Sequence, residues 1–128
     1  MPLETMEPNP VWVEDAYAET VDVFEAYGED LVFRVWGGDW CKDCRSQLPD
    51  FGAALDAAEV PEDNVVHYEL DQDKQGPGVE EYDIEYIPTV VVESNGEEIA
   101  RFVEEESVPI SVYLADEIEA TLGSVSNA

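Results

Sequence analysis

The stretch Trp40-Cys41-Lys42-Asp43-Cys44 contains both cysteines of the chain and separates two apolar segments of different periodicity. Residues 31–36, which precede it, form the short and mostly apolar run that is typical of a central strand. After it, apolar residues recur at steps of four and three, which predicts a helix with one buried stripe: Cys44, Leu48, Phe51, Leu55 and Ala58. The cysteine pair is therefore predicted to join a buried strand to the start of a helix.

This position predicts different roles for the two sulfur atoms. A thiolate at a helix N-terminus is stabilised by unpaired backbone N–H groups and by the helix dipole, which makes Cys41, as an exposed first-turn residue, the candidate nucleophile. Cys44 lies one turn further along on the buried stripe, where it can reach the sulfur of Cys41 but no external substrate. The pair is thus suited to thiol–disulfide exchange, in which Cys41 attacks a disulfide and Cys44 resolves the mixed disulfide.

Explanations of the cysteine pair other than thiol–disulfide exchange are less well supported by the sequence. A disulfide between residues so close in sequence closes too small a loop to stabilise a fold usefully. A CxxC pair can also be half of a zinc site, but the chain has no second cysteine pair and one histidine, His67. An inert chance pair is the other alternative. We therefore expect neither a metal nor a bound cofactor.

The remaining elements alternate between helix and strand along the chain. Periodicity and turn residues predict helices over residues 13–27, 78–82 and 108–122 and strands over 64–70, 88–93 and 98–103, with turns or stops at Gly28, Asn95-Gly96 and Gly123. Pro49 is expected to kink the helix that begins near Cys41. This order predicts one α/β domain, residues 13–123, with a central mixed sheet flanked by helices on both faces. Residues 1–12 form an N-terminal extension, and residues 124–128 form a C-terminal tail.

Over residues 13–122 the chain resembles the thioredoxin family. The resemblance is carried, in this order, by Trp40-Cys41-x-x-Cys44, Pro49 in the following helix, Leu70-Asp71-Gln72-Asp73, Tyr82-x-Ile84, Ile87-Pro88-Thr89 and Asn95-Gly96-Glu97. It implies a thioredoxin fold with Cys41 and Cys44 as the catalytic dithiol. It also implies that the Ile87–Pro88 peptide bond is cis and lies against the cysteines. Ile87 and Pro88 would there bind the backbone of the substrate, and Trp40 would form a partly exposed wall of the active site.

The residues between the cysteines depart from the family pattern. Thioredoxins usually carry Gly-Pro there, whereas this chain has Lys42-Asp43, and the aspartate is similar to that of the WC-x-DC subgroup. Lys42 favours the thiolate of Cys41 and Asp43 opposes it, so both are expected to modulate its reactivity. A glycine that thioredoxins place near the substrate groove aligns with Glu104, whose charged side chain is expected to narrow the groove or repel acidic partners.

A second departure concerns the proton of Cys44. The buried aspartate that typical thioredoxins hold behind the resolving cysteine aligns with Val35, and its lysine partner aligns with His67. Cys44 therefore lacks the usual proton acceptor. His67 is a candidate replacement, because its unperturbed pKa near 6.5 suits the task. The alternative is that His67 is a structural residue of its strand.

The charge of the chain is the most unusual feature of its composition. Thirty-two Asp and Glu residues face five basic ones, which gives a formal net charge of −27. Scattered carboxylates with so few lysines indicate adaptation to molar salt, because a Debye length of roughly 3 Å at 1 M screens the repulsion between surface charges. The alternative is an acidic domain that docks on a basic partner. Nucleic-acid binding is disfavoured, since phosphates carry the same sign of charge.

These observations together predict a thiol–disulfide oxidoreductase that reduces protein or small-molecule disulfides. Its electron donor is expected to be a reductase or a small thiol. No apolar run is long enough to span a membrane and the N-terminus does not read as a secretory signal, so we expect a cytoplasmic protein, and a monomer. Two alternatives stay open: an oxidase or isomerase of the same fold, and a thioredoxin-like binding module with non-catalytic cysteines.

Overall fold

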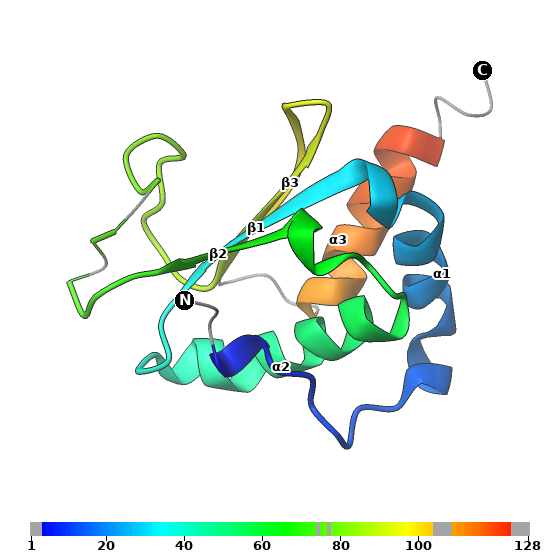
Figure 1. The fold of residues 1–128 in the computed structure, drawn as a ribbon, viewed down its shortest axis with the longest axis horizontal. Helices are drawn as coiled ribbons and strands as arrows, with labels where there is room; N and C mark the ends of the chain where they lie inside the picture. The colour runs from blue at the N-terminus through cyan, green and yellow to red at the C-terminus, as the bar shows by residue number, and fades with distance from the viewer. Residues whose placement is uncertain (1–3, 74, 77, 104–108, 124–128) are drawn as a thin grey trace.

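The structure, a computed structural model, describes residues 4–73, 75–76, 78–103 and 109–123. Its centre is a four-stranded sheet in the order β2-β1-β3-β4 (Figure 1). The strands are β1 (Leu31–Gly37), β2 (Val65–Glu69), β3 (Thr89–Ser94) and β4 (Glu97–Val103). β1 pairs in parallel with β2 and antiparallel with β3, and β3 pairs antiparallel with β4. The mixed sheet predicted from the sequence is confirmed, and β2 is one of its edges.

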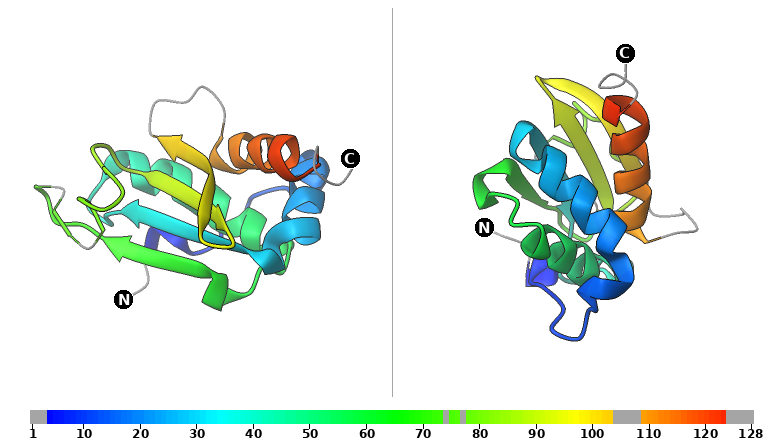
Figure 2. Two further views of the ribbon diagram at one scale, coloured as in Figure 1. Left: turned by 90° about the horizontal axis from the view of Figure 1, so that it is seen from above. Right: turned by 90° about the vertical axis from the view of Figure 1, so that its right-hand side faces the viewer.

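Three helices pack beside this sheet: α1 (Ala18–Tyr27), α2 (Lys42–Ala57) and α3 (Ile110–Ile118). They contact one another, and α3 also packs on β4 (Figure 2). Among the described residues, none of the helices combines the length and the apolar character that a membrane crossing requires. The α/β architecture that the alternation of the sequence predicts is confirmed, but all three helices pack on the face of the sheet that carries Phe33 and Phe102, so the predicted helix on the second face is absent from the described residues.

The core between these helices and the sheet is held by three aromatic rings. Phe24 of α1, Phe33 of β1 and Phe51 of α2 are fully or almost fully buried, with ring centroids 5.7 to 6.3 Å apart. Edge-to-face and tilted rings at such separations are favourable arrangements for aromatic pairs. This cluster fixes α2 against β1, and it thereby fixes the junction between them, where the cysteines lie.

The opposite face of the sheet carries a polar and aromatic network. Nε of Arg34 donates to Oε1 of Glu93 at 2.7 Å, and Nη1 of Arg34 donates to the hydroxyl of Tyr68 at 2.6 Å. The hydroxyl of Tyr82 donates to the second oxygen of Glu93 at 3.0 Å. Trp36 stacks on Tyr68 with ring centroids 4.4 Å apart. The carboxylate of Glu93 is thus buried with hydrogen-bond partners on both oxygens, as a buried charge requires.

The segment that covers this second face is a turn and not the short helix predicted over residues 78–82. The N–H of Tyr82 donates to the carbonyl of Gly78, and the N–H of Ile84 donates to that of Val79. A helix does not propagate from there, because Gly78 has φ +77, in the left-handed region. The prediction was wrong because helical spacing in five residues cannot reveal such a backbone.

Two other helix predictions need correction at their ends. The helix predicted over residues 13–27 begins as a 3₁₀ turn, Glu14–Tyr17, before α1 proper. Gly28 follows α1 with φ −58, so it begins a further 3₁₀ turn and not a left-handed stop. At the other end of the chain, α3 continues as a π turn, Glu119–Gly123. The predicted start at Val108 lies outside the described residues.

The described part of the N-terminal extension runs along α2 and is tied to the loop before this helix and to the helix itself. The N–H of Thr5 donates to Oδ1 of Asp39 at 3.0 Å, just before the cysteine pair. The N–H of Asn9 donates to the carbonyl of Pro49 at 3.1 Å, and its side-chain amide donates to Asp50 at 2.7 Å. The extension is therefore packed on the helix that follows the cysteines.

Close packing of this extension depends on Gly52 of α2. A Cβ atom at this position would collide with the backbone carbonyl oxygen of Met6. Glycine in a helix interior otherwise costs about 1 kcal/mol relative to alanine. Gly52 therefore lowers the helix propensity of α2 but allows the backbone of the extension to pack closely against the helix.

We expect Gly52→Ala to destabilise the chain by about 1–2 kcal/mol, because overpacking outweighs the gain in helix propensity. Chemical denaturation in molar salt measures the change, and amide hydrogen exchange at residues 5–9 should show loss of protection. Ser46→Ala, at an exposed position of the same helix, is the matched control and should leave both unchanged or slightly stabilised. A Gly52→Ala chain that is more stable than the wild type would contradict this role.

Candidate active site

Cys41 is the N-cap residue of α2, at the junction that the sequence predicts. Its backbone is extended, and its Sγ accepts a hydrogen bond from the N–H of Cys44 at 3.3 Å. The N–H of Cys41 donates to the carbonyl of Gly38 at 3.0 Å, which holds the turn that precedes the helix. Sulfur thus replaces the oxygen of an ordinary capping side chain and faces the unpaired amides of the helix.

The exposure of Cys41 differs from the expectation of an exposed first-turn residue. Only 8% of its surface is accessible, because the capping geometry turns its sulfur toward the helix. Cys44 has no accessible surface, and both cysteines are free thiols in this structure. Cys41 therefore keeps a small accessible surface, whereas Cys44 is fully enclosed and lies within hydrogen-bond distance of the sulfur of Cys41.

Burial of Cys44 also sets its protonation. Desolvation raises the pKa of the Cys44 thiol well above its ordinary value, and its hydrogen bond with Cys41 raises it further. The sulfur of Cys44 is therefore a neutral thiol at neutral pH. It can attack only after it gives up its proton.

Trp40 directly precedes Cys41 and is held in place by a side-chain hydrogen bond. Its Nε1–H donates to the carbonyl of Leu70 at 2.9 Å, and the residue is 37% exposed. Leu70 in turn donates its N–H to the carbonyl of Gly37 at the end of β1. These bonds hold the indole against the segment that follows β2, and its role as a wall of the active site stays a prediction.

Ile87 and Pro88 come to the same end of the sheet. β3 is antiparallel to β1 with Thr89 opposite Trp36, so Pro88 precedes β3 at the end where β1 leads to the cysteines. The Ile87–Pro88 peptide bond is cis, the isomer that the resemblance implies. Ile87 and Pro88 are both buried, whereas neighbouring Tyr86 is 48% exposed.

Lys42 and Asp43 lie in the first turn of α2 with exposed side chains. Behind the cysteines, Val35 is fully buried and pairs with His67 across β1 and β2. A buried apolar residue therefore stands where typical thioredoxins, by the resemblance, hold an aspartate. Glu104 lies outside the described residues.

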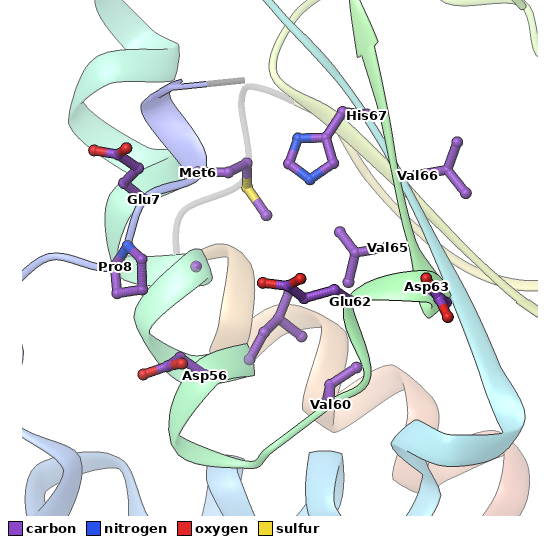
Figure 3. Close-up of a pocket in the computed structure, with 12 residues that line it drawn as sticks. Met6, Glu7, Pro8, Asp56, Val60, Glu62, Asp63, Val65, Val66 and His67 are labelled. Atoms are coloured by element: carbon purple, nitrogen blue, oxygen red, sulfur yellow. The ribbon is translucent and has the colours of Figure 1, made fainter. Parts of the chain in front are cut away.

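His67 faces an open pocket of about 670 Å³ between β2, the N-terminal extension and α2 (Figure 3). Met6 and Glu62 line the same pocket. Burial lowers the pKa of His67 below its ordinary value, and it outweighs the opposing charges of Asp39 and Glu62. Proton transfer from Cys44 to His67 stays a prediction.

Two features of the site were missed by sequence reasoning. The link from Thr5 to Asp39 joins residues far apart in the chain, for which the sequence carries no signal. Arg45, whose N–H donates to the carbonyl of Cys41 at 3.0 Å, was predictable, because residues four apart on a helix share a face. Among the described residues, no group of histidine, cysteine and acidic side chains is arranged to hold a metal ion.

Comparison with known proteins gives the following matches. A sequence model of the thioredoxin family matches residues 12–115. A point mutant of thioredoxin from Halobacterium salinarum is 23% identical, with a TM-score of 0.50 and coverage of 94% of each chain. Thioredoxin from Fasciola hepatica is 22% identical, with a TM-score of 0.50, and the match covers 81% of this chain and 92% of that one. No curated protein matches significantly. At these identities the solved structures show similarity of fold alone.

Proposed function

The chain belongs to the thioredoxin family, and on this premise we propose that it is a thiol–disulfide oxidoreductase that reduces disulfides of proteins or small molecules. The observation that carries the proposal is the asymmetry of the dithiol. Cys41 caps α2 and keeps a small accessible surface, whereas Cys44 donates its N–H to the sulfur of Cys41 and is itself inaccessible. This arrangement suits a nucleophile and a resolving thiol.

The reaction consists of two exchange steps. The Cys41 thiolate attacks one sulfur of a substrate disulfide, so that a mixed disulfide forms and the first substrate thiolate leaves. Cys44 then loses its proton and attacks Sγ of Cys41, which forms the Cys41–Cys44 disulfide and releases the second substrate thiolate. The substrate gains two electrons and the dithiol loses two, and the departing thiolates take up protons.

The remaining site residues bind the substrate or adjust the reactivity of Cys41 in this proposal. Ile87 and Pro88 present backbone to an extended substrate segment, while Trp40 shields the mixed disulfide from water. Lys42 and Asp43 modulate the reactivity of Cys41, and no cofactor is needed for the exchange itself. A reductase or a small thiol supplies two electrons to regenerate the dithiol.

The reduction potential tests the proposed direction. We expect the Cys41–Cys44 couple to lie near the value of a reductant, about −270 mV, and the chain to reduce insulin disulfides in molar salt with dithiothreitol as the electron donor. Equilibration with glutathione buffers, followed by thiol alkylation and mass measurement, gives the potential. A value near −120 mV would instead identify an oxidase of the same fold.

A further inference from the structure

We propose that this active site selects disulfides flanked by carboxylates in an acidic polypeptide, and that Lys42 and Arg45 make the selection. The inference rests on the proposed function and names its substrate class. It starts from the positions of the few cations in a chain of net charge −27.

Two of the five basic residues are engaged on the face of the sheet opposite to α2. Arg34 forms an ion pair with Glu93 at 2.7 Å, and Arg101 forms one with Glu98 at 2.9 Å. Lys74 lies outside the described residues. Lys42 and Arg45 are exposed, and within the described part of the chain neither forms an ion pair. Among the described residues, the lysine and arginine side chains that form no ion pair therefore belong to Lys42 and Arg45, close to Cys41 in the sequence.

Helix geometry places both cations around the turn that Cys41 caps. Successive helical residues are turned by about 100°, so Lys42 and Arg45 lie about 60° apart, and Arg45 is four positions after Cys41. Helical side chains also lean toward the N-terminus, which directs Arg45 toward the turn of Cys41. By the same geometry exposed Asp43 lies about 160° from Arg45 and about 100° from Lys42. The nearest acidic neighbour before the helix, Asp39, accepts the N–H of Thr5.

The pocket at His67 differs in charge from the surface around Lys42 and Arg45. Glu7, Asp56, Glu62 and Asp63 line it, and no lysine or arginine does (Figure 3). An acidic polypeptide would be repelled from that surface, whereas at α2 it meets two cations and the positive end of the helix dipole. Exposed Trp40 and Tyr86 add apolar area for the residues that accompany the disulfide.

Ionic strength separates this local attraction from the repulsion by the whole chain. At 0.1 M salt the Debye length is about 10 Å, and the field of −27 charges opposes an acidic substrate. At 1 M it falls to about 3 Å, so long-range repulsion is screened while contact pairs a few ångströms apart persist. We therefore expect the preference to be clearest in molar salt.

The experiment compares three synthetic peptides with one internal disulfide, identical except for glutamate, glutamine or lysine on both sides of it. The second-order rate constant for each is measured with the reduced chain in 1 M salt. We expect the glutamate peptide to react about 3- to 10-fold faster than the glutamine peptide, and the lysine peptide to react more slowly than both. The ratio of rates is the readout, because a change in thiolate reactivity affects all peptides alike.

Lys42→Gln with Arg45→Gln should bring the glutamate-to-glutamine ratio close to one. Ala18→Glu with Ala26→Glu is the matched control, since it makes the same change in net charge at exposed positions of α1 and should preserve the ratio. A ratio near one in the wild type, or a preference that survives loss of both cations, would overturn the inference while the proposed function stands. If none of the peptides is reduced, the proposed function fails and the inference fails with it.

Discussion

Replacing Cys41 by serine should lower disulfide reduction to the rate measured without protein. The serine hydroxyl is a far weaker nucleophile than a thiolate, and Cys44 cannot substitute for it because its sulfur has no accessible surface. Turbidity of insulin in molar salt with dithiothreitol measures the rate. Far-ultraviolet circular dichroism of the variant verifies that the fold is retained.

Cys44→Ser should keep the first step and lose the second. A disulfide peptide should then remain attached to Cys41 as a mixed disulfide, which mass spectrometry detects as an added mass on the peptide that contains Cys41. In the wild type, release should accelerate about tenfold per pH unit through neutrality, because the raised pKa of Cys44 keeps its sulfur protonated there. This pH dependence disappears in the variant.

Two results would contradict this division of roles. One is attachment of the peptide to Cys44 in a Cys41→Ser chain, which would show that the inner thiol is accessible in solution. The other is a wild-type chain that reduces no disulfide while Cys41→Ser leaves the binding of disulfide proteins unchanged, which is the behaviour of a binding module with non-catalytic cysteines.

The second large effect is expected from salt. The chain should be folded at 1 M salt and should unfold on dialysis below about 0.1 M, because the Debye length grows from about 3 to 10 Å and repulsion among the exposed carboxylates is no longer screened. A domain of this kind is stable by only about 5–15 kcal/mol, so this repulsion is enough to unfold it. Thermal melts followed by circular dichroism at graded salt concentrations measure the effect.

Sucrose at the osmolality of 1 M salt provides the control for this salt effect. It strengthens burial by exclusion from the protein surface but does not screen charge, so it should restore the fold much less than salt does. An unchanged melting temperature in dilute buffer would remove the interpretation as salt adaptation.

Features set by local chemistry were predictable from the sequence. The strand, the cysteine pair and the helix follow from apolar spacing over residues 31–58, and the structure has β1 and α2 in these places. The hairpin at Asn95-Gly96 follows from residues that tolerate positive φ, and both have it, at 55° and 82°. Pro49 lies inside α2, as predicted.

Features set by contacts between distant residues were not predictable. The N-terminal extension is held by bonds from Thr5 and Asn9 to residues that lie more than 30 positions away. The turn in place of a helix after Gly78 depends on one left-handed backbone angle. The low exposure of Cys41 follows from a capping bond to its sulfur, which the spacing of residues does not reveal.

The formation of a reversible bond between the two sulfur atoms tests the central claim most directly. The reduced wild-type chain is titrated with an oxidant in molar salt, free thiols are alkylated, and the peptide that contains residues 41–44 is analysed by mass spectrometry. We expect the oxidised peptide to lose about two mass units and both alkylation sites, and reduction to restore them fully. Two thiols that remain alkylatable, or that oxidise only into disulfides between chains, would contradict it.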